Sequence, residues 1–378
     1  MTSPHYDAIV IGLGAMGSAA LYHLAKRGVR VAGFDRHSPP HPFGSTHGHS
    51  RIIREAYYEH PQYVPLVRRA YELWNELEAE CGRRLFRRTG GLMLGPRNGM
   101  LVSGARRSAL EHEIPHEELS AAEVSARFPA FCVPDSMVGL LETRAGVLHP
   151  EGCVEAHLTL ARRAGAHVHA GEQVLRWTKD GEGVKVDTPT GSYVADRVAV
   201  AAGAWATELF PDLALPLSVE RQVMHWFEPR AEPARFALEY CPVSMIEYTP
   251  DHILYTLPNS GEGFKAATHH NGESADPNTV RREVAPDEVE QVRKLLRQFL
   301  PLANGELRAS ATCLYTNTPD RDFLIDFHPT DARVLLVSPC SGHGFKFASA
   351  IGEAVAQLLT TGDSDADLAP FRLERFRQ

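Results

Sequence analysis

The chain has 378 residues, a formal net charge of −8 at pH 7 and a hydrophobic fraction of 43%. This length predicts roughly two domains with a sizeable core, and the negative charge argues against nucleic acid and anionic membrane surfaces as partners. No apolar run reaches the ~20 residues that a membrane-spanning helix needs.

The N-terminus and the cysteines indicate the cellular compartment in which the protein is expected. The first expected strand follows almost directly on residues 1–6, which leaves no room for a signal peptide and predicts a cytoplasmic protein. The six cysteines are scattered without a C-x-x-C pair, so we expect neither a disulfide framework nor a zinc site. The 19 histidines show no H-E-x-x-H or similar spacing, and no metal is expected.

Residues 7–36 have the pattern of a dinucleotide-binding unit. Residues 7–11 are a short apolar run, typical of a strand buried on both faces. Residues 18–27 have helical composition, and residues 29–34 predict a second strand that ends at Asp35. Strand, tight turn, helix, strand and acid in this order are the arrangement that binds an adenine dinucleotide.

The glycines of this unit stand as G-x-G-x-x-G at Gly12, Gly14 and Gly17. The first permits the tight turn, the second lets the backbone approach a pyrophosphate, and the third lets the helix pack closely on the strand. The phosphates then meet free N–H groups at the helix N-terminus, and Asp35 is placed to accept hydrogen bonds from a ribose hydroxyl. The motif by itself does not choose between NAD and FAD.

The next 180 residues alternate between loops, helices and strands. Residues 37–50 are too rich in Pro, Gly and His for a regular element, and a loop of this size is usually functional. The patterns further predict a helix over 64–80, a strand over 88–94, a capping box that opens a helix at 120–123, a helix over 157–164, a strand over 166–170, a hairpin over 174–186 and a buried strand over 193–201. That last strand leads to Gly203, where a glycine would serve either to bring the strand end close to the cofactor or simply to allow close packing.

The sequence pattern changes after residue 214. Strand-like pieces at 221–227, 243–247, 253–257 and 264–268 alternate with turns, and an amphipathic helix is expected over 287–299. These elements predict an antiparallel sheet with a helix, separate from the parallel sheet. A strand over 333–337 and a glycine-led helix over 342–359 then return to the first domain.

The fold class predicted is therefore α/β plus α+β. A Rossmann-like dinucleotide domain is discontinuous and comprises residues 1–86, 145–213 and 314–378. A second, substrate-binding domain comprises residues 87–144 and 214–313 and is built on a mostly antiparallel sheet.

Two further segments carry chemistry. The first is Cys313–Asp322 and the second is Ser341–Lys346, whose backbone N–H groups precede a helix and offer another anion cradle. Lys346 would lie in the first turn of that helix, which is the unfavourable end for a cation. This position indicates that the lysine is there for a partner.

Four separated motifs now carry a family resemblance. The glycine motif, GSTHGHSRIIR at 44–54, CLYTNTPD at 313–320 and SGHGFK at 341–346 together resemble the monomeric sarcosine oxidase and N-methyltryptophan oxidase family. The match runs from about residue 5 to the C-terminus, and the family belongs to the D-amino-acid-oxidase type of flavoproteins. The resemblance implies FAD as the cofactor, bound covalently through the sulfur of Cys313 to the 8α position of the flavin.

The resemblance also implies roles for individual residues. Arg54 and Lys346 would bind a substrate carboxylate, Arg51 would sit by the flavin ring, and Tyr57 and Tyr255 would line the substrate pocket. Lys265 would lie beneath the flavin and activate dioxygen, and His269 would contact the substrate; residues four apart on a strand point to the same face. The implied cofactor-binding residues are Gly12, Gly14, Gly17, Asp35, Arg36, Ser45, His47, Arg51, Val174, Gly203, Cys313, Gly342, Gly344 and Lys346.

The function implied is oxidation of a secondary amine, most simply an N-methyl amino acid such as sarcosine, with dioxygen. The products would be formaldehyde, the amino acid and hydrogen peroxide, and the enzyme would be a monomer without nucleic-acid or membrane partners. An oxidase of a bulkier or cyclic amine, such as N-methyltryptophan, proline, pipecolate or a glycated amino acid, stays open. A non-catalytic flavin-binding subunit is a weaker alternative, because it would be expected to lack the charged residues Arg54, Lys265 and Lys346, which are all present. A nicotinamide dehydrogenase is the remaining alternative.

Overall fold

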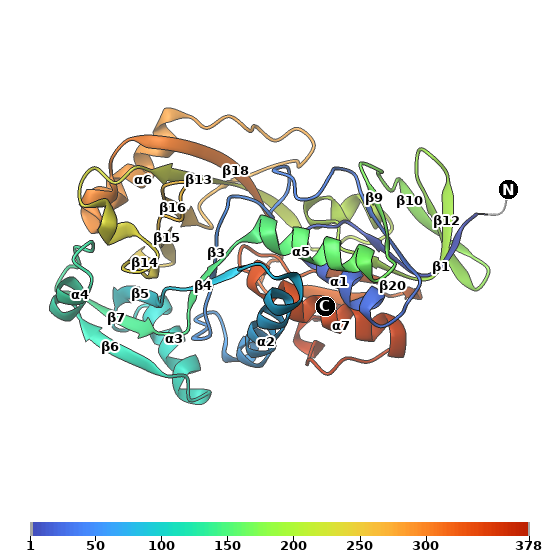
Figure 1. The fold of residues 1–378 in the computed structure, drawn as a ribbon, viewed down its shortest axis with the longest axis horizontal. Helices are drawn as coiled ribbons and strands as arrows, with labels where there is room; N and C mark the ends of the chain where they lie inside the picture. Colours follow the sequence, from blue (N-terminus) through green and yellow to red (C-terminus); the bar gives the residue numbers. More distant parts are fainter. Residues whose placement is uncertain (1–2, 377–378) are drawn as a thin grey trace.

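The computed structural model describes residues 3–376 and shows two lobes side by side along the long axis of the molecule (Figure 1). Each lobe is built around its own large sheet, one of eight strands and one of nine. A three-stranded sheet lies between them.

The eight-stranded sheet has the order β10-β11-β12-β1-β2-β9, with β20 on β12 and β19 on β20. Its centre is parallel, since β1 pairs in parallel with β2 and β12, β2 with β9, and β12 with β20. The strands are β1 (His5–Ile11), β2 (Val31–Asp35), β9 (His167–Ala170), β10 (Arg176–Asp180), β11 (Gly183–Asp187), β12 (Ser192–Val200), β19 (Leu324–His328) and β20 (Asp331–Ser338). The apolar runs at β1 and β2 are thus central strands covered on both faces, as the sequence predicts.

Four helices belong to this lobe. They are α1 (Ala15–Lys26), α2 (Val64–Cys81), α5 (Pro150–Arg163) and α7 (Ala348–Thr361), and α1 packs against both α5 and α7. Three contact the sheet, and the fourth, α2, packs against two of the others. A Cβ on Gly352 of α7 would lie 2.5 Å from the Cβ of Ala19 of α1. A glycine facing an alanine is therefore what lets these two helices approach so closely.

The nine-stranded sheet has the order β17-β13-β16-β15-β14-β5-β7-β6, with β18 also on β13. It is antiparallel except for the pair β14 and β5. Its strands are β5 (Gly91–Pro96), β6 (His116–Ser120), β7 (Met137–Glu142), β13 (Ser218–Phe227), β14 (Val243–Thr249), β15 (His252–Leu257), β16 (Phe264–His269), β17 (Glu273–Ser274) and β18 (Leu307–Asn317). It is accompanied by α3 (Met100–Glu111), α4 (Ala121–Arg127) and α6 (Pro286–Phe299), and α6 buries Val292, Leu296 and Phe299 in this lobe's core.

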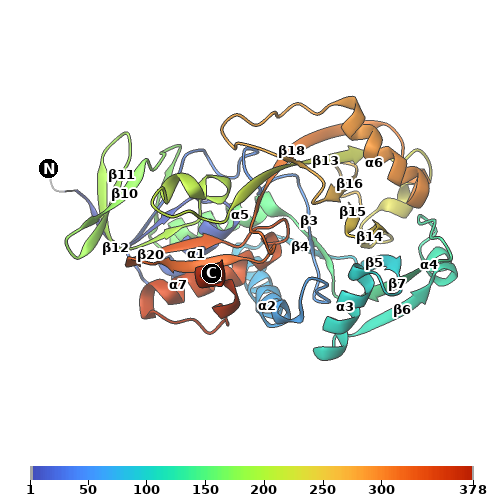
Figure 2. The same ribbon diagram turned by 180° about the vertical axis from the view of Figure 1, so that it is seen from behind.

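The small sheet joins β3 (Arg51–Ile53), β8 (Gly146–Leu148) and β4 (Phe86–Arg88), all antiparallel. It lies where the two lobes meet, and the view from behind shows the same arrangement (Figure 2). Arg51 therefore begins a strand at the junction of the lobes, and its guanidinium lies beside β13 and β18 of the nine-stranded sheet.

The fold class expected from the sequence is confirmed, and several elements differ in detail. The capping box at Ser120 and Glu123 is present. Helix α5 begins at Pro150, seven residues before the expected start at 157, with His149 as its N-cap and the proline in its first turn. The short strands β3, β4, β6, β7, β8 and β19 carry too little alternation to be assigned from the sequence.

Two corrections concern the C-terminal third. Strand β18 pairs with β13 from Leu307 to Asn317, so the predicted domain boundary between residues 313 and 314 falls inside a strand. Helix α7 begins at Ala348, not at Gly342, and Lys346 lies in a 3₁₀ turn over Phe345–Phe347 that precedes it. The unfavourable dipole position expected for Lys346 is therefore not what the structure shows.

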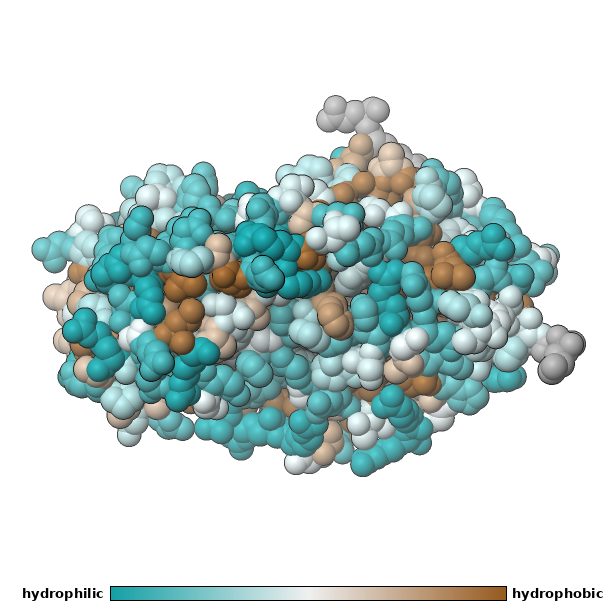
Figure 3. All heavy atoms as spheres, turned by 90° about the horizontal axis from the view of Figure 1, so that it is seen from above, coloured by the Kyte–Doolittle hydropathy of each residue, from teal (hydrophilic) through white to brown (hydrophobic). Residues whose placement is uncertain are grey.

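The surface is mixed in character. On the face in Figure 3, hydrophobic side chains form small groups among hydrophilic ones, not one broad apolar patch. Among the described residues, no helix combines the length and the apolar character that crossing a bilayer requires.

Candidate active site

One long cavity runs from the glycine motif to the nine-stranded sheet and is lined by residues of both lobes. It collects most of the residues predicted from the sequence, although they come from distant parts of the chain. These are Gly12, Gly14, Asp35, Arg36, Ser45, Arg51, Arg54, Val174, Gly203, Tyr255, His269, Cys313, Gly342, Gly344 and Lys346.

The glycine end is shaped as a cradle. Gly12 has φ +87°, and a Cβ there would lie 2.5 Å from the carbonyl oxygen of Ala201. A Cβ on Gly17 would lie 1.7 Å from the carbonyl oxygen of Gly12, so helix α1 reaches the turn only because Gly17 has no side chain. No side chain caps α1 at Gly14, and the N-terminus of this helix meets the cavity at Met16. These features suit a pyrophosphate.

Asp35 is held for hydrogen bonding at the end of β2. Its Oδ2 accepts from the N–H of Leu13 at 2.8 Å and its Oδ1 from the N–H of His37 at 2.8 Å. Burial works to raise the pKa of Asp35, but hydrogen bonds from His41 and from these two N–H groups outweigh it and lower the pKa. The carboxylate therefore stays charged and can accept from a ribose hydroxyl.

Next to Asp35, the Arg36 guanidinium lies 5.0 Å from the centre of the Trp205 ring. The side chain of Asn278 accepts from Trp205 Nε1 at 2.9 Å and from Arg36 Nη1 at 3.3 Å. A cradle of glycines, a helix N-terminus in the cavity wall and a charged acid at the end of β2 fit the adenosine and pyrophosphate part of a dinucleotide. The cofactor expected from the sequence thus fits the residues that are present.

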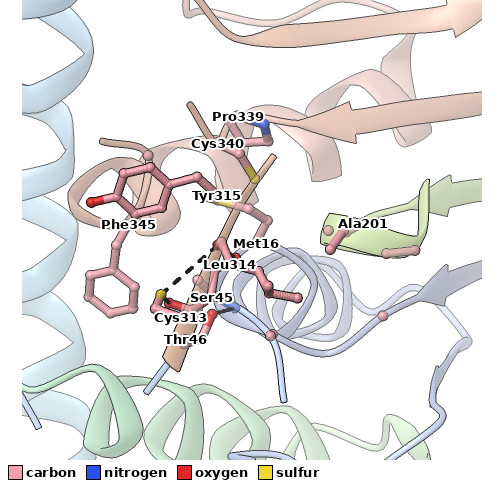
Figure 4. Close-up of a pocket in the computed structure, with 18 of the residues that line it drawn as sticks. Met16, Ser45, Thr46, Ala201, Cys313, Leu314, Tyr315, Pro339, Cys340 and Phe345 are labelled. Carbon is pink, nitrogen blue, oxygen red and sulfur yellow. Dashed lines mark hydrogen bonds between the residues drawn. The ribbon is translucent and has the colours of Figure 1, made fainter. Parts of the chain in front are cut away.

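Cys313 on β18 and the loop after β2 meet in the middle of the cavity (Figure 4). Ser45 Oγ donates to the carbonyl oxygen of Leu314 at 2.5 Å. Arg51 Nη2 donates to the carbonyl oxygen of Ser45 at 2.8 Å and lies 3.8 Å from Cys313 Sγ. The thiol thus lies in the cavity wall beside a guanidinium.

Two buried cations converge at the other end of the cavity. The guanidinium of Arg54 lies 4.2 Å from the centre of the Tyr57 ring, and Lys346 Nζ lies 5.3 Å from the same ring. Burial, reinforced by Arg54, lowers the pKa of Lys346 to about 7. Two cations on one aromatic ring are suited to an anionic ligand.

Glu59 occupies the guanidinium of Arg54. Arg54 Nη2 donates to the two carboxylate oxygens of Glu59 at 2.7 and 2.6 Å. Among the described residues, the buried Nε–H of Arg54 has no acceptor. Burial works to raise the pKa of Glu59, but Arg54 outweighs it and the pKa is lowered. Glu59 thus supplies the carboxylate that the sequence analysis assigns to a substrate.

Lys265 and His269 come from one strand, β16, but differ in their access to the cavity. His269 lines it and its Nδ1 lies 3.2 Å from the Tyr315 hydroxyl. Lys265 Nζ donates to the carbonyl oxygens of Gly48 and Ser50 at 3.0 and 2.9 Å. Burial, reinforced by Arg51, holds the pKa of Lys265 well below its usual value.

Four predicted residues are not among the described residues that line the cavity, namely Gly17, His47, Tyr57 and Lys265. Gly17 acts through helix packing. Tyr57 is fully buried and its hydroxyl pairs with His343 Nδ1, so it supports Arg54 and Lys346 from beneath and does not line the pocket. Burial, reinforced by Arg51 and Lys265, lowers the pKa of His47 to about 3, and its Nε2 has no partner among the described residues.

The sequence analysis misses two residues of the site. Glu59 lies five residues after Arg54 with no motif to mark it. Tyr315 stands inside the CLYT motif and lines the cavity beside His269. A Cβ on Gly342 would lie 2.5 Å from the Tyr315 ring and 2.8 Å from the His269 ring, so the glycine of SGHGFK makes room for both.

Comparison with known proteins follows this geometry. The model of the family described as "FAD dependent oxidoreductase" matches residues 7–358. The chain is 42% identical over 364 residues to a monomeric sarcosine oxidase from Streptomyces avermitilis, covering 95% of both proteins. It is 38% identical to an N-methyl-L-tryptophan oxidase from Yersinia pestis, covering 98% of this chain and 100% of that protein.

Solved structures agree on the fold. NikD, an unusual amino acid oxidase of nikkomycin biosynthesis, has a TM-score of 0.86 at 25% identity and 98% coverage of both chains. A glycine oxidase from Geobacillus kaustophilus has a TM-score of 0.82 at 21% identity and 99% coverage of both chains. The chain therefore belongs to the FAD-dependent oxidoreductases, in the monomeric sarcosine oxidase and N-methyltryptophan oxidase family, and is an FAD-dependent oxidase that acts on amine donors.

Proposed function

We propose that the protein oxidises an N-methyl amino acid of the sarcosine type with dioxygen. One dioxygen and one water are consumed, and formaldehyde, the demethylated amino acid and hydrogen peroxide are formed. The observation that carries the proposal is the pair of buried cations, Arg54 and Lys346, on the ring of Tyr57 at one end of the cavity. The 42% identical relative named monomeric sarcosine oxidase supports the same substrate class.

The substrate carboxylate takes the place of Glu59 on Arg54. A planar guanidinium binds a carboxylate through two parallel hydrogen bonds, which fixes direction as well as position. Lys346 supplies the second charge, and His269 and Tyr255 line the cavity where the amine would lie. Holding the carboxylate at one end positions the N-methyl carbon toward the middle of the cavity.

Bound FAD supplies the two-electron acceptor and passes the electrons on to dioxygen. We propose that Cys313 Sγ is joined to the 8α carbon of the flavin. Forming this bond removes two electrons and two protons from the thiol and the 8α methyl group, and dioxygen takes them up as hydrogen peroxide. The position of Cys313 in the cavity wall, 3.8 Å from Arg51 Nη2, supports the proposal.

Lys265 is proposed to assist the reaction with dioxygen. A fixed ammonium stabilises negative charge as it develops on oxygen, and Lys265 is fixed by two carbonyl acceptors, Gly48 and Ser50. Lys265→Met holoenzyme should still be reduced by amine without oxygen, but should reoxidise at least ~10-fold more slowly. Stopped-flow absorbance measures both half-reactions, and an unchanged reoxidation rate would disprove the role.

A bulkier N-methyl or cyclic amine is the second candidate. The relative named N-methyl-L-tryptophan oxidase aligns with 98% of this chain, nearly the coverage found for the sarcosine oxidase. Both candidate substrates carry a carboxylate, so the cations Arg54 and Lys346 do not distinguish them.

A peroxide assay decides between them. Purified enzyme is incubated with sarcosine, N-methyltryptophan, proline and pipecolate, and hydrogen peroxide and formaldehyde are measured. Equal amounts of both products from sarcosine support the main proposal, whereas peroxide without formaldehyde points to a cyclic amine. Absence of peroxide with every amine would overturn the oxidase proposal for these substrates.

We also propose that the enzyme works as a monomer in the cytoplasm. The name of the Streptomyces relative supports the monomer. Sedimentation equilibrium of the purified protein tests the oligomeric state, since a dimer would give about twice the mass of the single chain.

A further inference from the structure

A buried carboxylate outside the cavity touches the segment that carries Arg54. Glu142 is the last residue of β7 and has no exposed surface. Both of its carboxylate oxygens accept from the N–H of Glu55 at 2.9 Å, and Oε2 also accepts from the N–H of Ala56 at 2.8 Å. Glu142 is thus tied to the two residues that follow Arg54.

The same segment braces the guanidinium. Arg54 Nη1 donates to the carbonyl oxygen of Ala56 at 3.2 Å. The N–H of Ala56 is held by Glu142 and its carbonyl oxygen is held by Arg54, so one residue links the two side chains. A change at Glu142 is therefore transmitted to the guanidinium through the backbone of Ala56.

The surroundings fix the rest of this segment independently. The carboxylate of Glu55 pairs with Arg144 Nη1 at 2.9 Å and with Arg68 Nε. Ser108 donates its hydroxyl to the carbonyl oxygen of Tyr57. The segment is thus held at Glu55 and at Tyr57 by other groups, and Glu142 alone holds the N–H of Ala56 between them.

A carboxylate at this place is costly for stability. Burial raises the pKa of Glu142 to about 7, against the N–H groups of Ala56 and Glu55, which lower it. The charged groups that face it are Glu55 and Arg54 from the segment itself. Burying a charged carboxylate costs stability, so the presence of Glu142 is weak evidence that it stabilises the fold. Its hydrogen bonds to the segment that carries Arg54 indicate a role in the active site instead.

We propose that Glu142 is a positioning residue, which holds the N–H groups of Glu55 and Ala56 and thereby directs the Arg54 guanidinium toward the substrate carboxylate. This inference deepens the proposed function and rests on its assignment of Arg54. Glu142 itself is not among the described residues that line the cavity, so it acts through Arg54.

The test uses Glu142→Gln holoenzyme at a pH well above 7. The amide keeps one oxygen, which can still accept from both N–H groups at the place of Oε2, but its N–H₂ group then faces the N–H of Glu55 in the place of Oε1, and the negative charge is lost. Titration with acetate, followed by the visible absorbance of the flavin, should show an affinity ~10-fold weaker than that of the unaltered enzyme. The limiting rate of anaerobic reduction by saturating sarcosine should change less than about twofold. The variant loses binding energy that is equal in the ground state and the transition state, so the rate of the chemical step is preserved.

Ser108→Ala is the matched control. It removes one hydrogen bond from the same segment, at Tyr57, and leaves the brace at Ala56 in place, so its acetate affinity should be unchanged. If Glu142→Gln does not fold, Glu142→Asp keeps the charge and shortens the side chain by one methylene, and it should also bind acetate more weakly.

An unchanged acetate affinity in the Glu142 variant would overturn the inference, as would an equal loss in Ser108→Ala. The acetate titration needs no turnover, so it remains readable if sarcosine proves not to be a substrate. Absence of acetate binding in the unaltered enzyme would reject the assignment of Arg54 and the inference with it.

Discussion

At the scale of single residues, the contact between Arg54 and Glu59 decides how the site receives an anion. The two side chains form a buried pair, with Glu59 nearer to solvent than Arg54. Breaking such a pair leaves an uncompensated charge, but an incoming carboxylate keeps Arg54 paired while the partly exposed Glu59 carboxylate turns to water. An incoming carboxylate can therefore take over the guanidinium at modest cost, while a neutral ligand cannot.

Glu59→Gln removes the internal competitor for Arg54. We expect the KM for an N-methyl amino acid to fall severalfold, because the substrate no longer displaces a carboxylate, and the Tm to fall because Arg54 and Lys346 lose their nearby negative charge. Steady-state kinetics and thermal unfolding measure both. Glu353→Gln, which breaks the pair with Arg69 away from the cavity, is the control for KM; a KM that rises in Glu59→Gln would contradict the competition.

Lys346 gives the site a pH dependence. Burial and Arg54 lower its pKa to about 7, so the ammonium is present below that pH and is lost above it. The affinity for acetate, which has no amine to titrate, should therefore weaken as the pH rises through 7. The same titration with Lys346→Met should not weaken as the pH rises through 7, and a pH-independent affinity in the unaltered enzyme would exclude the charge of Lys346 from binding.

The sign of the effect on folding follows from the same pKa. The unfolded lysine titrates near 10.5 and the folded one near 7, so between these values the unfolded state binds one more proton. Lys346 therefore destabilises the fold as the pH falls from the upper value to the lower one, and its full cost is present below about 7.

Cys313 is expected to hold the flavin covalently. Acid-precipitated protein should keep its yellow colour in the pellet, whereas Cys313→Ala should release all of it to the supernatant. Cys340→Ala is the matched control because Cys340 lines the same cavity, and it should behave as the unaltered protein does. Release of all colour from the unaltered protein would reject the linkage.

At the scale of elements, close backbone approach positions the site more than any single side chain does. Helix α1 meets the turn at Gly12 through Gly17 and meets α7 through Ala19 and Gly352. Strand β18 runs from one lobe to the cavity. Cys313 and Tyr315 are two residues apart on this strand, so they lie on the same face of it, and both line the cavity. The position of Cys313 relative to the glycine cradle thus depends on how α1, β18 and the loop after β2 are packed.

Gly352→Val tests the contact between α1 and α7. A branched side chain would start from a Cβ 2.5 Å from that of Ala19, and overpacking of this kind costs about 1–3 kcal/mol. We expect a lower Tm by thermal unfolding, together with weaker retention of FAD in the Cys313→Ala background. Gly191→Ala, where a Cβ meets nothing within 4 Å, should leave the Tm almost unchanged. An equal decrease of the Tm in both variants would show that the close contact between α1 and α7 does not require a glycine.

At the scale of the whole molecule, local patterns gave the parallel-sheet unit with its glycines and acid, the amphipathic helix α6 and the strands after residue 214. Each of these rests on the spacing of apolar residues within about ten positions, so neighbours along the chain are sufficient to predict it. The short strands of the middle sheet were missed because three residues show no period. The family motifs added most cavity residues, but they placed Tyr57 in the pocket wall, where the structure has it behind two cations.

The sequence by itself determined the cofactor unit, the fold class and the amine-oxidising family, because the glycine, arginine and cysteine motifs are short and continuous. Only the tertiary structure decided that Glu59 holds Arg54, that Glu142 braces the same segment from β7, and that β18 crosses the expected domain boundary. Such contacts depend on which buried charges and strand edges meet after folding. No periodicity along the chain encodes them, since the partners of one segment lie as far as 87 residues away.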